Sequence, residues 1–128
     1  MKKENLPLSP HLQIYKPQVT SILSISHRVS GFALNFSLII LVFGLLCTAL
    51  GEKYYNFFVL IIKSFPSKII IFLTILGFSY HLFNGIRHII WDFGFFLENK
   101  SSAIFGYLII FLALVSSVII CYMVGLFL

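Results

Sequence analysis

Residues 29–51, VSGFALNFSLIILVFGLLCTALG, form a stretch of 23 residues without a charged side chain. A helix needs about 20 mostly apolar residues to cross the hydrocarbon core of a bilayer. The stretch therefore predicts a transmembrane helix. We expect this helix to begin near Thr20 and to cover residues 21–51, so that its first turns carry several polar side chains.

Two later apolar runs predict two more spans. Residues 69–86 lack a charge, and we expect the helix around them to cover 67–95 because an 18-residue span is short. Residues 101–128 also lack a charge and predict a third helix, in which we find no site. The first loop, 52–68, contains an apolar stretch of nine residues, YYNFFVLII at 54–62. This stretch is too short to span, and its aromatic side chains favour the membrane interface.

The composition is that of a membrane protein. Of 128 residues, 59% are hydrophobic and 10% are charged, and the mean hydropathy is +1.02. Soluble domains carry about 25% charged residues. We therefore predict an all-α membrane protein with three transmembrane helices, in a single membrane-anchor domain over residues 1–128. The net charge of +5 comes from basic residues that mostly stand singly near the ends of apolar runs, which indicates membrane topology and argues against nucleic-acid binding.

Residues 1–20 form a polar segment with prolines at positions 7, 10 and 17, which disfavour helix. We expect it to be extended at the membrane surface or against a soluble partner. It has no apolar core of a secretory signal, so we expect insertion through the first helix into a bacterial inner (cytoplasmic) membrane, with an organellar membrane as the alternative. The basic residues favour a cytoplasmic N-terminus. Three spans place Lys2, Lys3, Lys16, Arg28, Arg87 and Lys100 on the N-terminal side, and Lys53, Lys63 and Lys68 on the other.

The second predicted helix carries the motif YHLFNGIRHIIWD at residues 80–92. His81, Gly85, His88 and Asp92 follow one another at steps of four, three and four, which places them on one stripe of a helix. An ionisable group within a span is a functional-site hypothesis by default. His81 could ligate haem iron through one ring nitrogen, and Gly85 would let a flat macrocycle approach the backbone.

His88 lies about 10 Å along the helix from His81. Together with Arg87 it could bind haem propionates, since cations suit carboxylates. The same residues also fit a structural interpretation, in which His81 hydrogen-bonds to a neighbouring helix and Gly85 permits close packing. The charged residues and Trp91 would then mark the interface. Residue spacing alone leaves both interpretations open.

A second motif, SILSISHRVSG at residues 21–31, opens the first predicted helix. Ser24, His27 and Arg28 lie at i, i+3 and i+4 and share a helix face. A hydroxyl, an imidazole and a guanidinium could donate to the two carbonyl oxygens of a quinone and carry protons. The alternative is a capped helix start with a basic residue that sets topology.

These motifs, in this order, resemble the large cytochrome b-type membrane-anchor subunits of succinate dehydrogenase, respiratory complex II. The resemblance rests on PLSPHLQIYKPQVTSILSISHRVSG at residues 7–31, on YHLFNGIRHIIWDFG at 80–94 and on the three-span layout. It covers essentially the whole chain. It implies electron transport from the tricarboxylic acid cycle to ubiquinone through a chain that is not catalytic alone.

The resemblance implies roles for individual residues. His81 is similar to the family's axial ligand of one haem b, whose second ligand comes from the small anchor subunit. Ser24, His27 and Arg28 resemble quinone-site residues, and His27 and Arg28, like Arg87 and His88, would lie near the propionates. For Asp92 we expect a proton-transfer or a structural role.

The resemblance also implies partners: the small anchor, an iron-sulfur subunit and a flavoprotein subunit. The alternatives are the anchor of a related fumarate reductase, or a small helix bundle or transporter without a cofactor. Cys47 and Cys121 stand alone inside apolar runs, without a CxxC or CxxCH motif, and predict inert thiols.

Overall fold

The computed structural model describes residues 16–127. Most of the polar N-terminal segment, including His11, therefore lies outside the described residues. The described part contains four helices in the order α1 (Val19–Ala49), α2 (Glu52–Ile62), α3 (Phe65–Asp92) and α4 (Asn99–Met123), and it contains no strand. The prediction of an all-α chain with three long apolar helices is confirmed.

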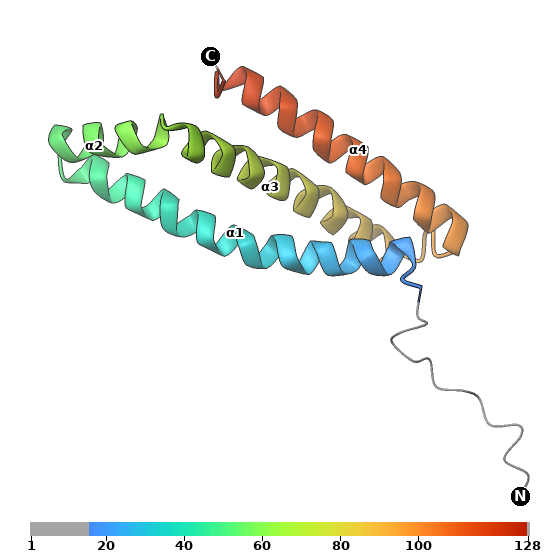
Figure 1. The fold of residues 1–128 in the computed structure, drawn as a ribbon. Coiled ribbons are helices and arrows are strands. Elements are labelled where there is room, and N and C mark those ends of the chain that lie inside the picture. Colours follow the sequence, from blue (N-terminus) through green and yellow to red (C-terminus); the bar gives the residue numbers. More distant parts are fainter. Residues whose placement is uncertain (1–15, 128) are drawn as a thin grey trace, which may run out of the picture.

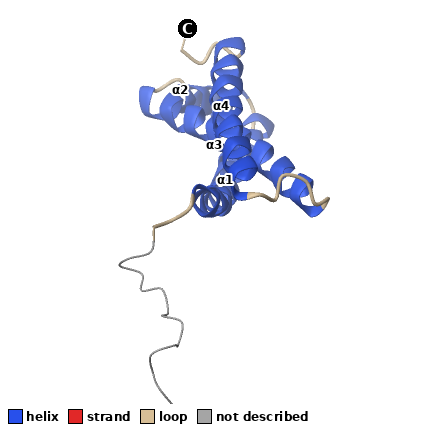
Figure 2. Cartoon of the chain, turned by 90° about the vertical axis from the view of Figure 1, so that its right-hand side faces the viewer, coloured by secondary structure: helices blue, strands red, loops and turns tan. Residues whose placement is uncertain are grey.

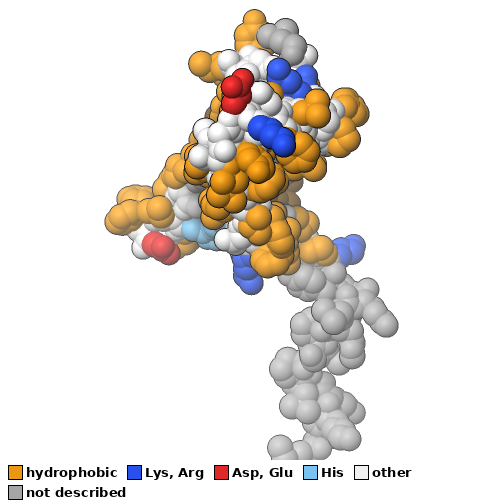
Figure 3. Space-filling model, turned by 90° about the vertical axis from the view of Figure 1, so that its left-hand side faces the viewer, with side chains coloured by type: hydrophobic (Ala, Val, Ile, Leu, Met, Phe, Trp, Pro, Cys, Tyr) orange, Lys and Arg blue, Asp and Glu red, His pale blue; other side chains and the backbone are white. Residues whose placement is uncertain are grey.

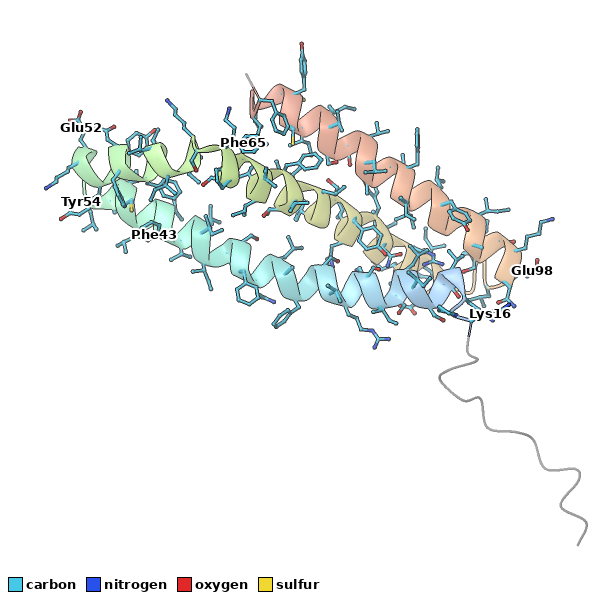
Figure 4. The ribbon with its side chains drawn as sticks, viewed as in Figure 1. Lys16, Phe43, Glu52, Tyr54, Phe65 and Glu98 are labelled. Carbon is cyan, nitrogen blue, oxygen red and sulfur yellow. The ribbon has the colours of Figure 1, made fainter. Side chains whose placement is uncertain are left out.

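The three long helices run alternately up and down, with α3 packed against both α1 and α4 (Figure 1). At about 1.5 Å per residue, even α4 is about 37 Å long, which exceeds the roughly 30 Å of a bilayer's hydrocarbon core. Figure 2 shows the same bundle turned by a quarter and built of helices and loops only. In Figure 4, Lys16 and Glu98 lie at one end of the bundle, and Glu52 and Tyr54 lie at the other.

Each long helix ends just before a glycine in the left-handed region. The φ angles are 104° at Gly51, 83° at Gly94 and 63° at Gly125. At the second and third of these, the N–H of the glycine and of the next residue bond back to carbonyls of the last turn, which satisfies carbonyl groups that the helix leaves free. The helices therefore end earlier than the expected ranges 21–51, 67–95 and 101–128.

The segment 52–68, expected as a loop, is helical over Glu52–Ile62. Gly51 ends α1, and Glu52 then places a carboxylate in the first turn of α2, where it suits the helix dipole. Pro66 stands in the first turn of α3, where a missing N–H costs no hydrogen bond. With 11 residues, α2 is too short to span and sits at the end of the bundle opposite the chain's first described residue (Figure 1).

The interior is more polar than the surface. Hydrophobic side chains cover most of the face in Figure 3, and charged side chains are few there. Inside the bundle, Arg87 and Asn84 are the two largest fully buried side chains, each with 0% of its surface exposed. On α4 the buried residues are mostly small, as helix interfaces in lipid require: Ser102, Gly106, Ile109, Ala113, Ser117 and Cys121. Cys47 and Cys121 are both free and buried.

Candidate functional site

A polar cluster joins α1 and α3 near the end of the bundle where the chain enters. His27 of α1 and His81 of α3 stack with ring centroids 4.0 Å apart and an angle of 11° between their planes. The His88 ring lies 5.1 Å from that of His27, and the Trp91 ring lies 5.2 Å from that of His88. The four rings thus form one contiguous cluster that runs along α3.

The two stacked histidines are tied to each other's backbone. The Nε2 of His27 lies 3.2 Å from the carbonyl oxygen of His81, and the Nδ1 of His81 lies 3.1 Å from the carbonyl oxygen of His27. A carbonyl oxygen only accepts a hydrogen bond. Each of these ring nitrogens must therefore carry the proton, and the two rings adopt opposite tautomers when neutral.

Ser30 reinforces the tautomer of His81. Its hydroxyl donates to the carbonyl oxygen of His27 over 2.8 Å, and its oxygen lies 3.2 Å from Nδ1 of His81. Because the hydroxyl proton is already used, its oxygen accepts from Nδ1–H. The proton of His81 is thereby held on Nδ1, and the lone pair of Nε2 remains available to a ligand or metal.

Two glycines leave room for this pair. A Cβ on Gly31 would stand 2.8 Å from Cε1 of His81, closer than real Cβ contacts, so the His81 ring lies directly on the α1 backbone. A Cβ on Gly85 would stand 3.6 Å from Nε2 of His27, an ordinary contact. Gly85 therefore packs against an imidazole here, and the crowded position is Gly31, which was quoted only as part of the sequence motif.

Further polar contacts hold α3 against α1. The Tyr80 hydroxyl donates to the carbonyl oxygen of Leu23 over 2.8 Å, and the Asn84 amide donates to the same oxygen over 3.4 Å. Neither residue was among the predicted site residues. Because both lie one helical turn or less from His81, they fix the depth at which the histidine pair meets α1.

Arg87 turns away from the histidines and toward α4. Its Nη2 donates to both the backbone oxygen and the hydroxyl of Ser102, each over 3.0 Å, and its Nη1 donates to Asn84 over 3.3 Å. Its guanidinium carbon lies 3.9 Å from the centroid of the Trp91 ring. Arg87 therefore ties α3 to α4 in this chain.

A pocket of about 560 Å³ opens where α1, α3 and α4 meet. We call it the link pocket because Leu97, in the segment 93–98 that links α3 to α4, lines part of it. It contains Ser24 and Arg28, two of the predicted quinone residues. Its full lining is Thr20, Ser21, Ser24, Ile25, Arg28, Trp91, Leu97, Asn99 and Ser102. The residues from the link and α4 were not predicted, since nothing in the sequence shows which turns meet at the end of a bundle.

The predicted residues thus do not form a single site. His27, His81, Gly85 and His88 share the ring cluster, while Ser24 and Arg28 line the link pocket, which Trp91 connects to that cluster. Arg87 belongs to the α3–α4 contact. Asp92 is exposed at the last residue of α3.

Three apolar helices that can cross a bilayer, with a half-buried histidine pair and a polar pocket at one end, define an integral membrane subunit. The chain matches the family described as succinate dehydrogenase/fumarate reductase transmembrane subunit over residues 2–120, and it belongs to that family. The family resemblance inferred from the sequence is confirmed.

Individual relatives agree with this assignment. The chain is 39% identical over 120 residues to a succinate dehydrogenase cytochrome b560 subunit of Marchantia polymorpha, with 87% of this chain and 85% of that protein covered. It is 41% identical over 104 residues to a succinate dehydrogenase cytochrome b556 subunit of Rickettsia prowazekii, with 81% of each covered. A b560 subunit of Reclinomonas americana is 36% identical over 120 residues, with 90% of this chain and 83% of that protein covered.

Proposed function

We propose that the chain anchors a succinate dehydrogenase in the membrane, contributes to its ubiquinone-reduction site and binds one haem b through His81. Succinate is oxidised in a flavoprotein subunit, and its electrons pass through an iron-sulfur subunit to ubiquinone. The observation that carries the proposal is the link pocket, which places Ser24 and Arg28 in one cavity at the end of the spans.

The link pocket suits a quinone head group. Its lining joins a hydroxyl and a guanidinium, which can each donate a hydrogen bond to a carbonyl oxygen, with apolar and aromatic side chains such as Ile25 and Trp91. Donors held against a carbonyl oxygen stabilise the negative charge that develops there when electrons arrive. Arg28, with its positively charged guanidinium, would supply that stabilisation, and Ser24 would orient the ring.

His81 fits an axial ligand of haem iron. The ligating imidazole must be neutral, with its other nitrogen fixed by a hydrogen bond to a backbone or side-chain acceptor. Here the carbonyl oxygen of His27 and the hydroxyl of Ser30 hold Nδ1–H, and Nε2 keeps its lone pair. A bound haem b would supply a one-electron carrier. Residues 16–127 contain no group of three or more metal-ligating side chains, and haem needs only axial ligands from protein.

The partners follow from this assignment. As the family resemblance implies, the small membrane anchor subunit would supply the second ligand of the haem iron, since Nε2–H of His27 is turned toward the backbone of α3. His27, Arg28 and His88 are the cations and donors available to the propionates. The end of the bundle with the link pocket faces the iron-sulfur subunit, on the cytoplasmic side of a bacterial inner membrane. The described basic residues Lys16, Arg28 and Lys100 lie toward that end, and an excess of basic residues favours the cytoplasmic side.

The experiment replaces Arg28 by Leu in the complete complex. We expect the succinate–ubiquinone reductase rate to fall at least tenfold, because a hydrogen bond from a charged donor to the developing charge is worth about 1.5–3 kcal/mol. Succinate oxidation with a soluble dye acceptor should stay unchanged, since it bypasses the pocket. Exposed Lys16→Leu is the matched control. Equal loss of both activities would show failed assembly, and an unchanged quinone rate would refute the assignment.

A reduced-minus-oxidised absorption spectrum tests the haem separately. The purified complex should show a low-spin haem b signal that co-purifies with the flavoprotein and iron-sulfur subunits. A colourless chain that is correctly inserted and bound to its partners would favour the alternative of a helix bundle without a cofactor.

A further inference from the structure

A long apolar groove lies between α1, α2 and α3, at the end of the bundle opposite the link pocket. It is lined by side chains of α1 between Ser37 and Thr48, of the segment 55–63 and of α3 between Ile70 and Ile75, and its volume is about 530 Å³. We call it the α2 groove. From Ser37 to Thr48 the lining follows α1 for about 16 Å. The groove is therefore elongated along the helices, which suits a flexible chain better than a compact ring.

The ring of Phe58 sets the shape of the α2 groove. A Cβ on Gly44 would stand 2.6 Å from Cζ of Phe58, so the ring rests directly on the α1 backbone. Phe43 meets the same ring edge-on, with centroids 5.9 Å apart. Phe58 also lines a second hollow of about 340 Å³. One seated aromatic ring thus holds α2 against α1 and borders both hollows.

The interior of the α2 groove offers little to a polar ligand. The hydroxyl of Thr48 donates to the carbonyl oxygen of Gly44 over 2.9 Å, and that of Ser37 donates to the carbonyl oxygen of Leu34 over 2.6 Å. Both hydroxyl protons are therefore used within α1. Leu41, which lines the groove, is 57% exposed, so the groove opens sideways to the bilayer. A hydrocarbon chain would fill it and gain dispersion contacts that an empty groove lacks.

The mouth of the groove is basic. Lys63 and Tyr55 line it at the level of α2. Glu52, the only acidic residue of the segment 52–68, lies at the opposite end of α2, about 16 Å along the axis from Lys63. The segment also carries Lys53 and Lys68, and the proposed orientation places it on the non-cytoplasmic side, where the positive-inside bias gives no reason for lysines. A cation above an apolar groove complements an amphiphile with an anionic head.

We propose that the α2 groove binds one anionic phospholipid, whose acyl chain lies along α1 and whose phosphate is bound by Lys63. The Tyr55 hydroxyl can donate a hydrogen bond to the same phosphate. Cations attract lipids of net negative charge more strongly than zwitterionic lipids, so the site selects its occupant by the headgroup. It shares no residue with the proposed haem and quinone sites.

The test uses the complete complex in phosphatidylcholine vesicles that contain phosphatidylglycerol with a photoreactive group in its acyl chain. Cross-links should form with the peptides of α1 and α3 that line the groove. Unlabelled phosphatidylglycerol, added at constant total lipid, should displace the probe. A phosphatidylcholine probe with the same photoreactive group should give about fivefold fewer cross-links at equal mole fraction, the effect of one lysine near an anionic headgroup.

Substitutions at Lys63 test the headgroup contact. Lys63→Gln removes the cation, and cross-linking by the phosphatidylglycerol probe should fall about fivefold. Lys63→Arg keeps the charge and should keep the cross-links. Lys53→Gln is the matched control, because it makes the same charge change in the same segment at a residue that does not line the groove. An equal fall in Lys63→Gln and Lys53→Gln would indicate diffuse surface charge and overturn the role of Lys63.

Leu41→Trp tests the path of the acyl chain without a change of charge. The larger side chain fills the groove, and the cross-links should be lost. Leu38→Trp is the matched control, since Leu38 is 56% exposed on the same helix and does not line the groove. If Lys63→Gln does not assemble with its partner subunits, this pair of variants decides whether the groove binds the probe.

Two results would overturn the proposal. Equal cross-linking by the two probes would show that the groove holds bulk lipid without recognition of the headgroup. Cross-links from neither probe, in a complex that contains all its subunits, would show that a partner subunit covers the groove.

Discussion

Gly31→Ala tests the histidine pair through a single added methyl group. The new Cβ would stand 2.8 Å from Cε1 and 3.4 Å from Nδ1 of His81. An ordinary contact begins near 3.4 Å, so the ring has to retreat by about half an ångström. It cannot slide freely, because its other side is stacked on His27 at 4.0 Å.

The magnitude follows from what this retreat breaks. The Nδ1 contacts, at 3.1 Å and 3.2 Å, would stretch past hydrogen-bond range. Two interhelical hydrogen bonds in a membrane protein are worth about 1 kcal/mol together, and overpacking adds about 1–3 kcal/mol. Alanine recovers about 1 kcal/mol through its higher helix propensity. We expect a net loss of about 1–3 kcal/mol in the stability of the α1–α3 contact.

The assay is the haem content per flavin of the purified complex, with the reduced-minus-oxidised spectrum. Displacement of His81 should lower the haem content or convert the low-spin signal to a high-spin one, while the chain still inserts. Gly77→Ala is the matched control. It makes the same substitution within a transmembrane helix, at a position where a Cβ would meet nothing within 4 Å.

A Gly31→Ala complex with unaltered haem content, spectrum and midpoint potential would refute the reasoning. It would mean that the His81 ring does not rest on the α1 backbone when haem is bound. A loss of haem in Gly77→Ala as well would point to a general effect of the added methyl groups on assembly.

Three further predictions concern the same bundle. Ser30→Ala removes one hydrogen-bond acceptor of His81 Nδ1–H, which makes the imidazole a weaker electron donor to iron. The haem midpoint potential should therefore rise by about 20–40 mV in a redox titration, and Ser30→Thr should restore the original potential. His81→Ala should abolish the low-spin haem signal and leave the helical circular dichroism unchanged. Gly106→Ala puts a Cβ into contact with Cδ1 of Leu23 and should destabilise the purified chain by about 1–3 kcal/mol in denaturant-induced unfolding in detergent.

Each of these predictions has an outcome that contradicts it. An unchanged potential in Ser30→Ala would show that the carbonyl oxygen of His27 alone holds the tautomer. A haem spectrum that survives in His81→Ala would make the ligand assignment wrong. If Gly106→Ala is as stable as the wild type, the Leu23 side chain rotates away without loss of packing.

The sequence alone determined the fold class. The uncharged stretches 29–51 and 101–128 can hide their backbone polar groups from lipid only as helices, so their number and approximate position follow from hydropathy. The family also follows from sequence, since it depends on the order of local motifs. The grouping of His81, Gly85 and His88 was predictable because helix geometry relates residues a few positions apart.

The three-dimensional structure decided the contacts between helices. That His81 rests on Gly31, that Ser30 fixes its tautomer and that Arg87 faces Ser102 depend on the rotation and depth of each helix relative to its neighbours. Hydropathy does not encode these quantities, because every face of such a helix is apolar enough for lipid. Small residues and buried hydrogen bonds set them instead, and these act only once the helices meet.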